Sequence, residues 1–112
     1  METETDPEVI DLEQLFYRTS GVYVLRVRGD SMIEDHLCDG DYVVIERRDQ
    51  ARDGEQVVAL LKSGEATLKR FYNEPDGRVR LQPANHTHTP RVMPADECKI
   101  RGVVIGVLRC YA

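Results

Sequence analysis

The stretch from residue 56 to residue 72, QVVALLKSGEATLKRFY, decides the fold. It contains two runs rich in β-branched and aromatic residues, 56–61 and 65–72, with Lys62-Ser63-Gly64 between them. Such runs favour extended strands, and a short glycine-containing connection between them is typical of an antiparallel hairpin. The stretch therefore predicts two neighbouring antiparallel strands.

The same kind of run recurs on both sides of this hairpin. It is found at residues 23–28, 41–46, 78–82 and about 99–109, with Asp-Gly and Pro-Asp-Gly turn signals between the runs. Six short strands with little helical periodicity predict a mostly β domain, built as compact, antiparallel, barrel-like curved sheets. Apolar residues at 9, 12, 15 and 16 predict one short helix, and residues 83–94, with three of the five prolines, predict an irregular loop.

Length and charge limit the functions that this chain can have. At 112 residues it has room for one domain, which we expect over residues 9–112 after a flexible acidic lead-in at residues 1–8. Lys and Arg number 15 against 20 Asp and Glu, which gives a net charge of −5. Because basic residues supply most non-specific affinity for nucleic acid, we expect no DNA-binding domain in this chain.

Neither a membrane span nor a metal site is expected. The longest uncharged apolar stretch, residues 102–108, is far shorter than the ~20 residues that a membrane helix needs. Three cysteines form neither a CxxC pair nor an even set, which is typical of free thiols in a reducing compartment, so we expect a cytoplasmic protein. The histidines and cysteines lack zinc-binding spacing, and we expect no metal and no cofactor.

A serine follows the first strand directly, in Gly29-Asp30-Ser31-Met32. A glycine before a serine at a strand-to-helix junction permits a sharp turn, which exposes the hydroxyl and directs successive backbone N–H groups at one point, as an oxyanion hole requires. Ser31 and Glu34 also fit the spacing of a helix capping box. Ser31 therefore has a catalytic interpretation and a structural one.

Lys69 lies in the middle of the second strand of the hairpin, where alternation places it on one face with Thr67 and Phe71. A lysine held against apolar surface loses its preference for the charged form, so its pKa falls and it can accept a proton from serine. The alternative is an outward charge on an exposed hairpin, like Arg70.

Six segments, in fixed order, resemble the C-terminal peptidase domain of the LexA repressor family. They are VRGDSM (27–32), DGDYVV (39–44), GEQVVA (54–59), EATLKRF (65–71), LQPAN (81–85) and GVVIGV (102–107). The resemblance spans about residues 10–109. It implies a mostly β fold, shared with signal peptidases, and a self-cleaving serine endopeptidase with Ser31 as nucleophile and Lys69 as general base, supported by Asp30, Met32 and Thr67.

The resemblance also implies a biological setting. The family represses the DNA-damage (SOS) response, and contact with an activated RecA filament promotes cleavage of an Ala-Gly type bond. An N-terminal domain, for which residues 1–22 offer no counterpart, makes the contact with DNA. Neither Ala-Gly nor Cys-Gly occurs in this sequence. The alternative is a UmuD-like processed accessory subunit of a translesion DNA polymerase, which acts as a binding module.

The apolar segment 100–108, IRGVVIGVL, bears on assembly. An exposed edge strand of this composition would promote aggregation unless it is covered, and a second copy can cover it about a twofold axis. Members of the resembled family dimerise through this region, so we expect a homodimer through the C-terminal strand. The alternative is a strand that is central within its own sheet.

Overall fold

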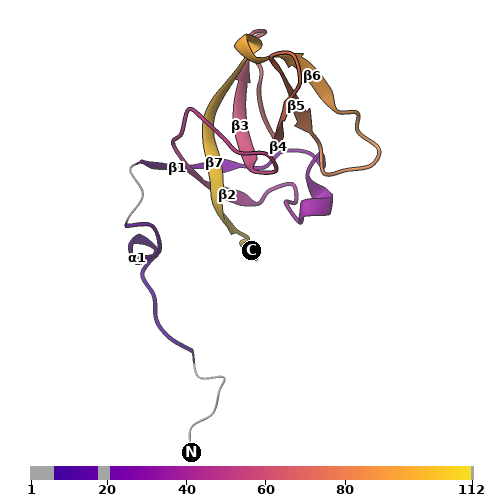
Figure 1. Ribbon diagram of the computed structural model, residues 1–112. Helices are drawn as coiled ribbons and strands as arrows, with labels where there is room; N and C mark the ends of the chain where they lie inside the picture. Colours follow the sequence, from indigo (N-terminus) through magenta and orange to yellow (C-terminus); the bar gives the residue numbers. More distant parts are fainter. Residues whose placement is uncertain (1–6, 18–20, 112) are drawn as a thin grey trace, which may run out of the picture.

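The computed structural model describes residues 7–17 and 21–111, and its core is a single antiparallel β-sheet (Figure 1). The strands are β1 (Val22–Arg26), β2 (Tyr42–Glu46), β3 (Gln56–Leu61), β4 (Ala66–Glu74), β5 (Arg78–Gln82), β6 (Arg91–Pro94) and β7 (Cys98–Leu108). The helical elements are α1 (Leu12–Phe16) and the short 3₁₀ helices η1 (Ile33–Asp35) and η2 (Ala95–Glu97). The prediction of a mostly β fold is confirmed, and all six predicted strands are present.

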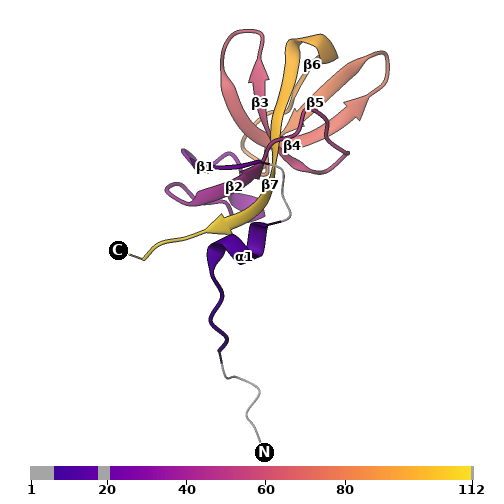
Figure 2. The ribbon, with the colours of Figure 1, turned by 90° about the vertical axis from the view of Figure 1, so that its left-hand side faces the viewer.

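The strands follow the order β1-β2-β7-β3-β4-β5-β6, so β1 and β6 are the two edges and the sheet is open. The long β7 joins the two halves of the sheet, β1-β2 on one side and β3-β4-β5-β6 on the other. It pairs with β2 through residues 103–108 and with β3 through residues 98–103, and each ladder contains an irregularity that bends the sheet. Figure 2 shows β1 and β2 running across the direction of β3, β4 and β5.

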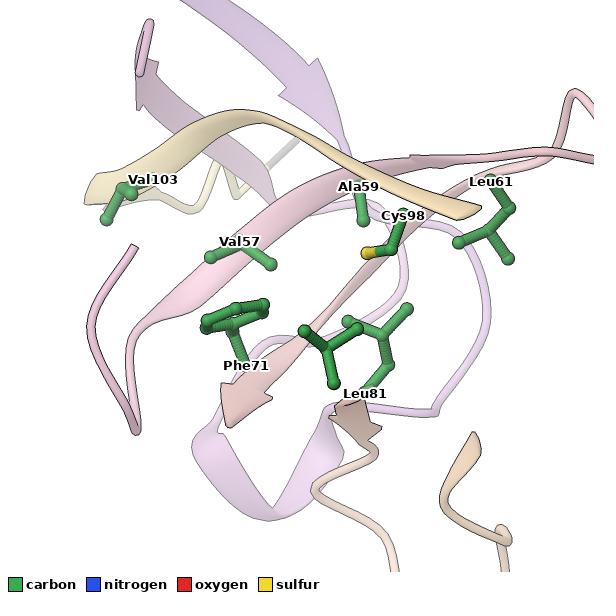
Figure 3. Close-up of a cluster of buried hydrophobic side chains, with 8 residues drawn as sticks. Val57, Ala59, Leu61, Phe71, Leu81, Cys98 and Val103 are labelled. Carbon is green, nitrogen blue, oxygen red and sulfur yellow. The ribbon is translucent and has the colours of Figure 1, made fainter. Parts of the chain in front are cut away.

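Each half of the sheet has its own apolar core. One cluster consists of Val57, Ala59, Leu61, Phe71, Val79, Leu81, Cys98 and Val103, between β3, β4, β5 and β7 (Figure 3). The other consists of Val27, Met32, Leu37, Val43, Ile45 and Val58. Because Met32 is only 2% exposed, the second core holds the residue that follows Ser31 in a fixed position.

Two local predictions need correction. Residues 83–94 are not irregular throughout, because 91–94 form β6, and Pro94 is tolerated because β6 is an edge strand. The short helix begins only at Leu12, after a capping box of Asp11 and Gln14, so Val9 precedes it. Most of the predicted lead-in, residues 1–6, lies outside the described residues. Within the described ranges no helix is long and apolar enough to cross a membrane.

The C-terminal strand is central rather than at an edge, as the alternative interpretation held. The free-edge interpretation is wrong for residues 98–103, which pair with β3. Residues 104–108 differ, since in the described part of the chain they pair with β2 alone. Val107 and Leu108 at the end of this segment are 45% and 38% exposed. In the described part of the chain, this half of β7 therefore has a partner strand on one side only.

Candidate active site

The turn that carries Ser31 connects β1 to η1. Gly29 adopts a positive φ of 83°, which a residue with a side chain rarely adopts, and its N–H donates to Asp39 Oδ1 at 2.8 Å. Further along, the Gly40 N–H donates to the Val27 carbonyl at 2.8 Å. These contacts close the loop between β1 and β2 and place Ser31, half-buried, over the second core.

The structure brings Ser31, Lys69 and Thr67 together, although Ser31 and Lys69 are 38 residues apart. Lys69 Nζ lies 3.2 Å from Ser31 Oγ and 2.7 Å from Thr67 Oγ1. Thr67 and Lys69 alternate onto one face of β4, as the strand pattern predicted. Lys69 is half-buried, and the amine contacts the serine instead of extending into solvent.

The surroundings of Lys69 weaken its preference for the charged form. Burial is the largest cause and lowers the pKa of Lys69 below its usual 10.5, with a smaller lowering from Arg91 that opposes the raising effect of Glu65. No ion pair found in the described residues includes Lys69. A neutral amine has a free lone pair, so Lys69 is suited to accept the proton of Ser31 Oγ.

A second contact connects the segment after Ser31 to β4, the strand that carries Lys69. Arg70, next to Lys69, donates two hydrogen bonds to Asp35 of η1, Nε to Oδ2 at 2.7 Å and Nη2 to Oδ1 at 3.0 Å. Gln56 Nε2 donates to the same carboxylate at 3.1 Å. Burial alone would raise the pKa of Asp35, but the hydrogen bonds from Arg70 and Gln56 outweigh it and lower the pKa.

The loop after β5 supports the serine turn from behind. Asn85 Nδ2 donates to the Asp30 carbonyl at 2.9 Å, and the Glu34 N–H donates to the Ala84 carbonyl at 2.7 Å. The Glu34 carboxylate accepts from the His86 N–H at 2.9 Å. The capping-box interpretation of Ser31 is therefore wrong, because Glu34 is engaged by this loop and η1 has no side-chain cap. The sequence pattern indicated no role for the loop.

A cleft of about 240 Å³ opens beside the serine. Its lining combines the polar Ser31, Thr67 and Lys69 with apolar side chains that include Leu25, Val27, Met32, Val43, Val58 and Leu68. The described residues contain no group of three or more His, Cys, Asp or Glu side chains suited to a metal ion. The arrangement can bind an apolar segment and present a hydroxyl and an amine to it.

A serine hydroxyl beside a half-buried amine, in an open cleft of a mostly β domain, places this chain among the serine peptidases. More specifically, the chain belongs to the Peptidase S24-like family, whose model matches residues 1–105. This confirms the family resemblance found in the sequence.

Curated relatives agree with this assignment. The chain is 48% identical over 111 residues to the LexA repressor of Koribacter versatilis, which covers 99% of this chain and 52% of the relative. It is 48% identical over 89 residues to the LexA repressor of Thermotoga neapolitana, a match that covers 80% of this chain and 42% of the relative. For the LexA repressor of Pseudothermotoga lettingae the identity is 40% over 109 residues, and the match covers 96% of this chain and 54% of the relative. The chain thus spans about half the length of these relatives.

Proposed function

We propose that this chain is the C-terminal self-cleavage and dimerisation domain of a LexA-type repressor, and that Ser31 and Lys69 form its catalytic dyad. The observation that carries the proposal is the 3.2 Å contact between Lys69 Nζ and Ser31 Oγ in the cleft. The names of the relatives, all LexA repressors, favour a repressor domain over a polymerase accessory subunit. The repressor would belong to the DNA-damage response, with an activated RecA filament as its partner.

The proposed reaction has two stages. Neutral Lys69 accepts the hydroxyl proton of Ser31 while Oγ bonds to the scissile carbonyl carbon, and the carbonyl π electrons move onto oxygen. The tetrahedral intermediate then collapses, the C–N bond breaks, and the lysine ammonium gives its proton to the leaving amine. In the second stage Lys69 takes a proton from water, the resulting hydroxide attacks the ester, and Ser31 Oγ regains a proton as the acid leaves.

Two neighbouring groups serve this reaction in the proposal. Thr67 Oγ1 accepts a hydrogen bond from Nζ at 2.7 Å, which holds the amine beside Ser31, where the lone pair of the neutral form can accept the Oγ proton. The backbone N–H groups of Asp30 and Ser31 have no protein acceptor in the described residues, so both are available to an oxyanion. Met32 contributes by its burial, which fixes the end of the turn.

The substrate is proposed to be an extended peptide with an Ala-Gly type bond. β1 is an edge strand, and Leu25 and Arg26 at its end line the cleft together with Val27 and Arg28. The free backbone groups of an edge strand can pair with an extended segment. The peptide would then lie along β1, with its scissile carbonyl near Ser31.

Dimerisation is proposed at the second half of β7. Residues 104–108 leave one side without a partner strand in the described part of the chain. Two copies can pair these sides antiparallel about a twofold axis and also cover Val107 and Leu108. DNA would be contacted by the part of a longer protein that the relatives' extra length represents.

The test is cleavage of an added polypeptide that carries the Ala-Gly segment. We expect slow cleavage by this chain, because tethering normally supplies a large effective concentration. Ser31→Ala and Lys69→Ala should each lower the rate by roughly a thousandfold or more. Ser63→Ala and Lys62→Ala, at the exposed hairpin turn, are matched controls that should retain the full rate. Equal cleavage by all four variants would refute the dyad.

A further inference from the structure

Asn85 is a buried polar side chain directly behind the serine turn. It is 7% exposed, and its Nδ2 donates to the Asp30 carbonyl at 2.9 Å. Its Oδ1 accepts from the Thr87 N–H at 3.0 Å and from Thr87 Oγ1 at 2.7 Å. Because a backbone N–H can only donate, the Thr87 contact fixes which end of the amide is oxygen and directs the NH₂ group at Asp30.

The carbonyl that Asn85 holds belongs to the peptide unit between Asp30 and Ser31. This unit is trans, and in a trans peptide the C=O and the following N–H point in opposite directions. With the Asp30 oxygen held on the side of residues 83–88, the Ser31 N–H points away from that loop. The Ile33 N–H also donates to the Asp30 carbonyl, at a longer 3.2 Å, so two donors hold the orientation of one peptide plane.

We propose that Asn85 is a positioning residue for the oxyanion hole. By anchoring the Asp30 carbonyl it keeps the Ser31 N–H directed at the developing oxyanion, an inference that rests on the proposed peptidase function. Rotation of this peptide plane would turn the N–H away and bring a carbonyl oxygen towards the negative charge. Donors that are already oriented contribute most to such a site, because nothing must reorganise during the reaction.

One substitution removes the hydrogen bond that Asn85 donates while keeping the size of its side chain. Asn85→Asp keeps the shape and the acceptor for Thr87, but the carboxylate cannot donate to the Asp30 carbonyl. Asn85→Ala removes both contacts. The matched control is Asn73→Asp, the same change at an exposed asparagine on β4 whose amide contacts Asp53.

The first readout is the kinetics of cleavage of the added Ala-Gly polypeptide. We expect kcat of Asn85→Asp to fall by about tenfold or more, less than the loss of an entire oxyanion donor, with KM changed little. The pH at half-maximal rate should stay at the wild-type value in Asn85→Ala, which introduces no charge, because Asn85 makes no contact with Lys69. Asn73→Asp should cleave at the wild-type rate. A kcat of Asn85→Asp within twofold of wild type, or a fall in the rate of Asn85→Ala accompanied by a shifted pH profile, would overturn the proposal.

The second readout does not depend on activity. In NMR spectra the Asp30 ¹³C′ and Ser31 ¹⁵N resonances should move in Asn85→Asp and stay in place in Asn73→Asp. If the wild-type chain does not cleave, the proposed function fails, and these resonances still decide whether Asn85 holds the peptide plane between Asp30 and Ser31. Unmoved resonances would overturn the positioning role, and moved ones would support it. A cleaving wild type with an equally active Asn85→Asp would refute only the positioning role.

Discussion

The Asp35–Arg70 contact gives the most specific stability prediction, because it ties η1, just after Ser31, to the residue beside Lys69. Asp35→Asn keeps the size of the side chain and removes its charge. The Asp35 side chain is 14% exposed and the Arg70 side chain 36%, and the two are joined by hydrogen bonds of 2.7 and 3.0 Å. Loss of such a contact should lower both the free energy of unfolding and the precision of the catalytic geometry.

The magnitude follows from the geometry. A hydrogen bond to a charged group contributes about 1.5–3 kcal/mol when water is excluded, and exposed ion pairs about 0–1 kcal/mol. The pair lies between these limits, and asparagine can still accept one bond from Arg70. We therefore expect Asp35→Asn to lower the free energy of unfolding by about 1–2 kcal/mol, or roughly 5–10 °C in Tm for a domain of this size.

The pH dependence has a definite sign. The pKa of Asp35 is lower in the folded chain than its usual 3.8, so the folded state favours the carboxylate. The contribution of the ionised Asp35 to the free energy of unfolding is therefore fully present above the pKa of the unfolded state, and it is lost as the pH falls through the pKa of the folded state. The difference in stability between wild type and Asp35→Asn should be constant near neutral pH and shrink below about pH 4.

The assay is urea unfolding together with cleavage of the Ala-Gly polypeptide. Asp35→Asn should also cleave about tenfold more slowly, since small displacements of reacting groups are costly. Glu74→Gln is the control, because Glu74 forms a similarly exposed ion pair with Arg80 at the end of β4, away from Ser31 and Lys69 in the strand. A fall in the cleavage rate as large in Glu74→Gln, or unchanged stability and cleavage in Asp35→Asn, would refute the reasoning.

Three further predictions follow. The cleavage rate should rise about tenfold per pH unit below the lowered pKa of Lys69 and then level off, as the pH–rate profile would show; a flat profile would exclude lysine as the base. Gly102→Ala should cost about 1–3 kcal/mol in urea unfolding, because the new Cβ would lie 2.3 Å from Ile45 Cγ2; an unchanged midpoint would contradict this packing. This acidic chain alone should bind no operator DNA in fluorescence anisotropy at physiological salt, and specific binding would contradict the assignment of its domain.

The sequence predicted those parts of the structure that depend on local pattern. Alternation within 65–72 placed Thr67 and Lys69 on one face, and glycine before Ser31 predicted an exposed turn. The β6 strand was missed because prolines at its ends resemble a loop. The contacts of Asn85 with Asp30, 55 residues away, and of Arg70 with Asp35, 35 residues away, arise only when the folded sheet brings distant segments together.

The most direct test of the central claim is covalent labelling of Ser31 by a fluorophosphonate, located by peptide mass spectrometry as a function of pH. The account predicts one adduct, on Ser31, whose rate of formation rises with pH as Lys69 loses its proton. Lys69→Ala should label far more slowly at every pH, whereas Lys62→Ala should label like the wild type. Labelling of another residue, or equal labelling of Ser31 without Lys69, would contradict the account.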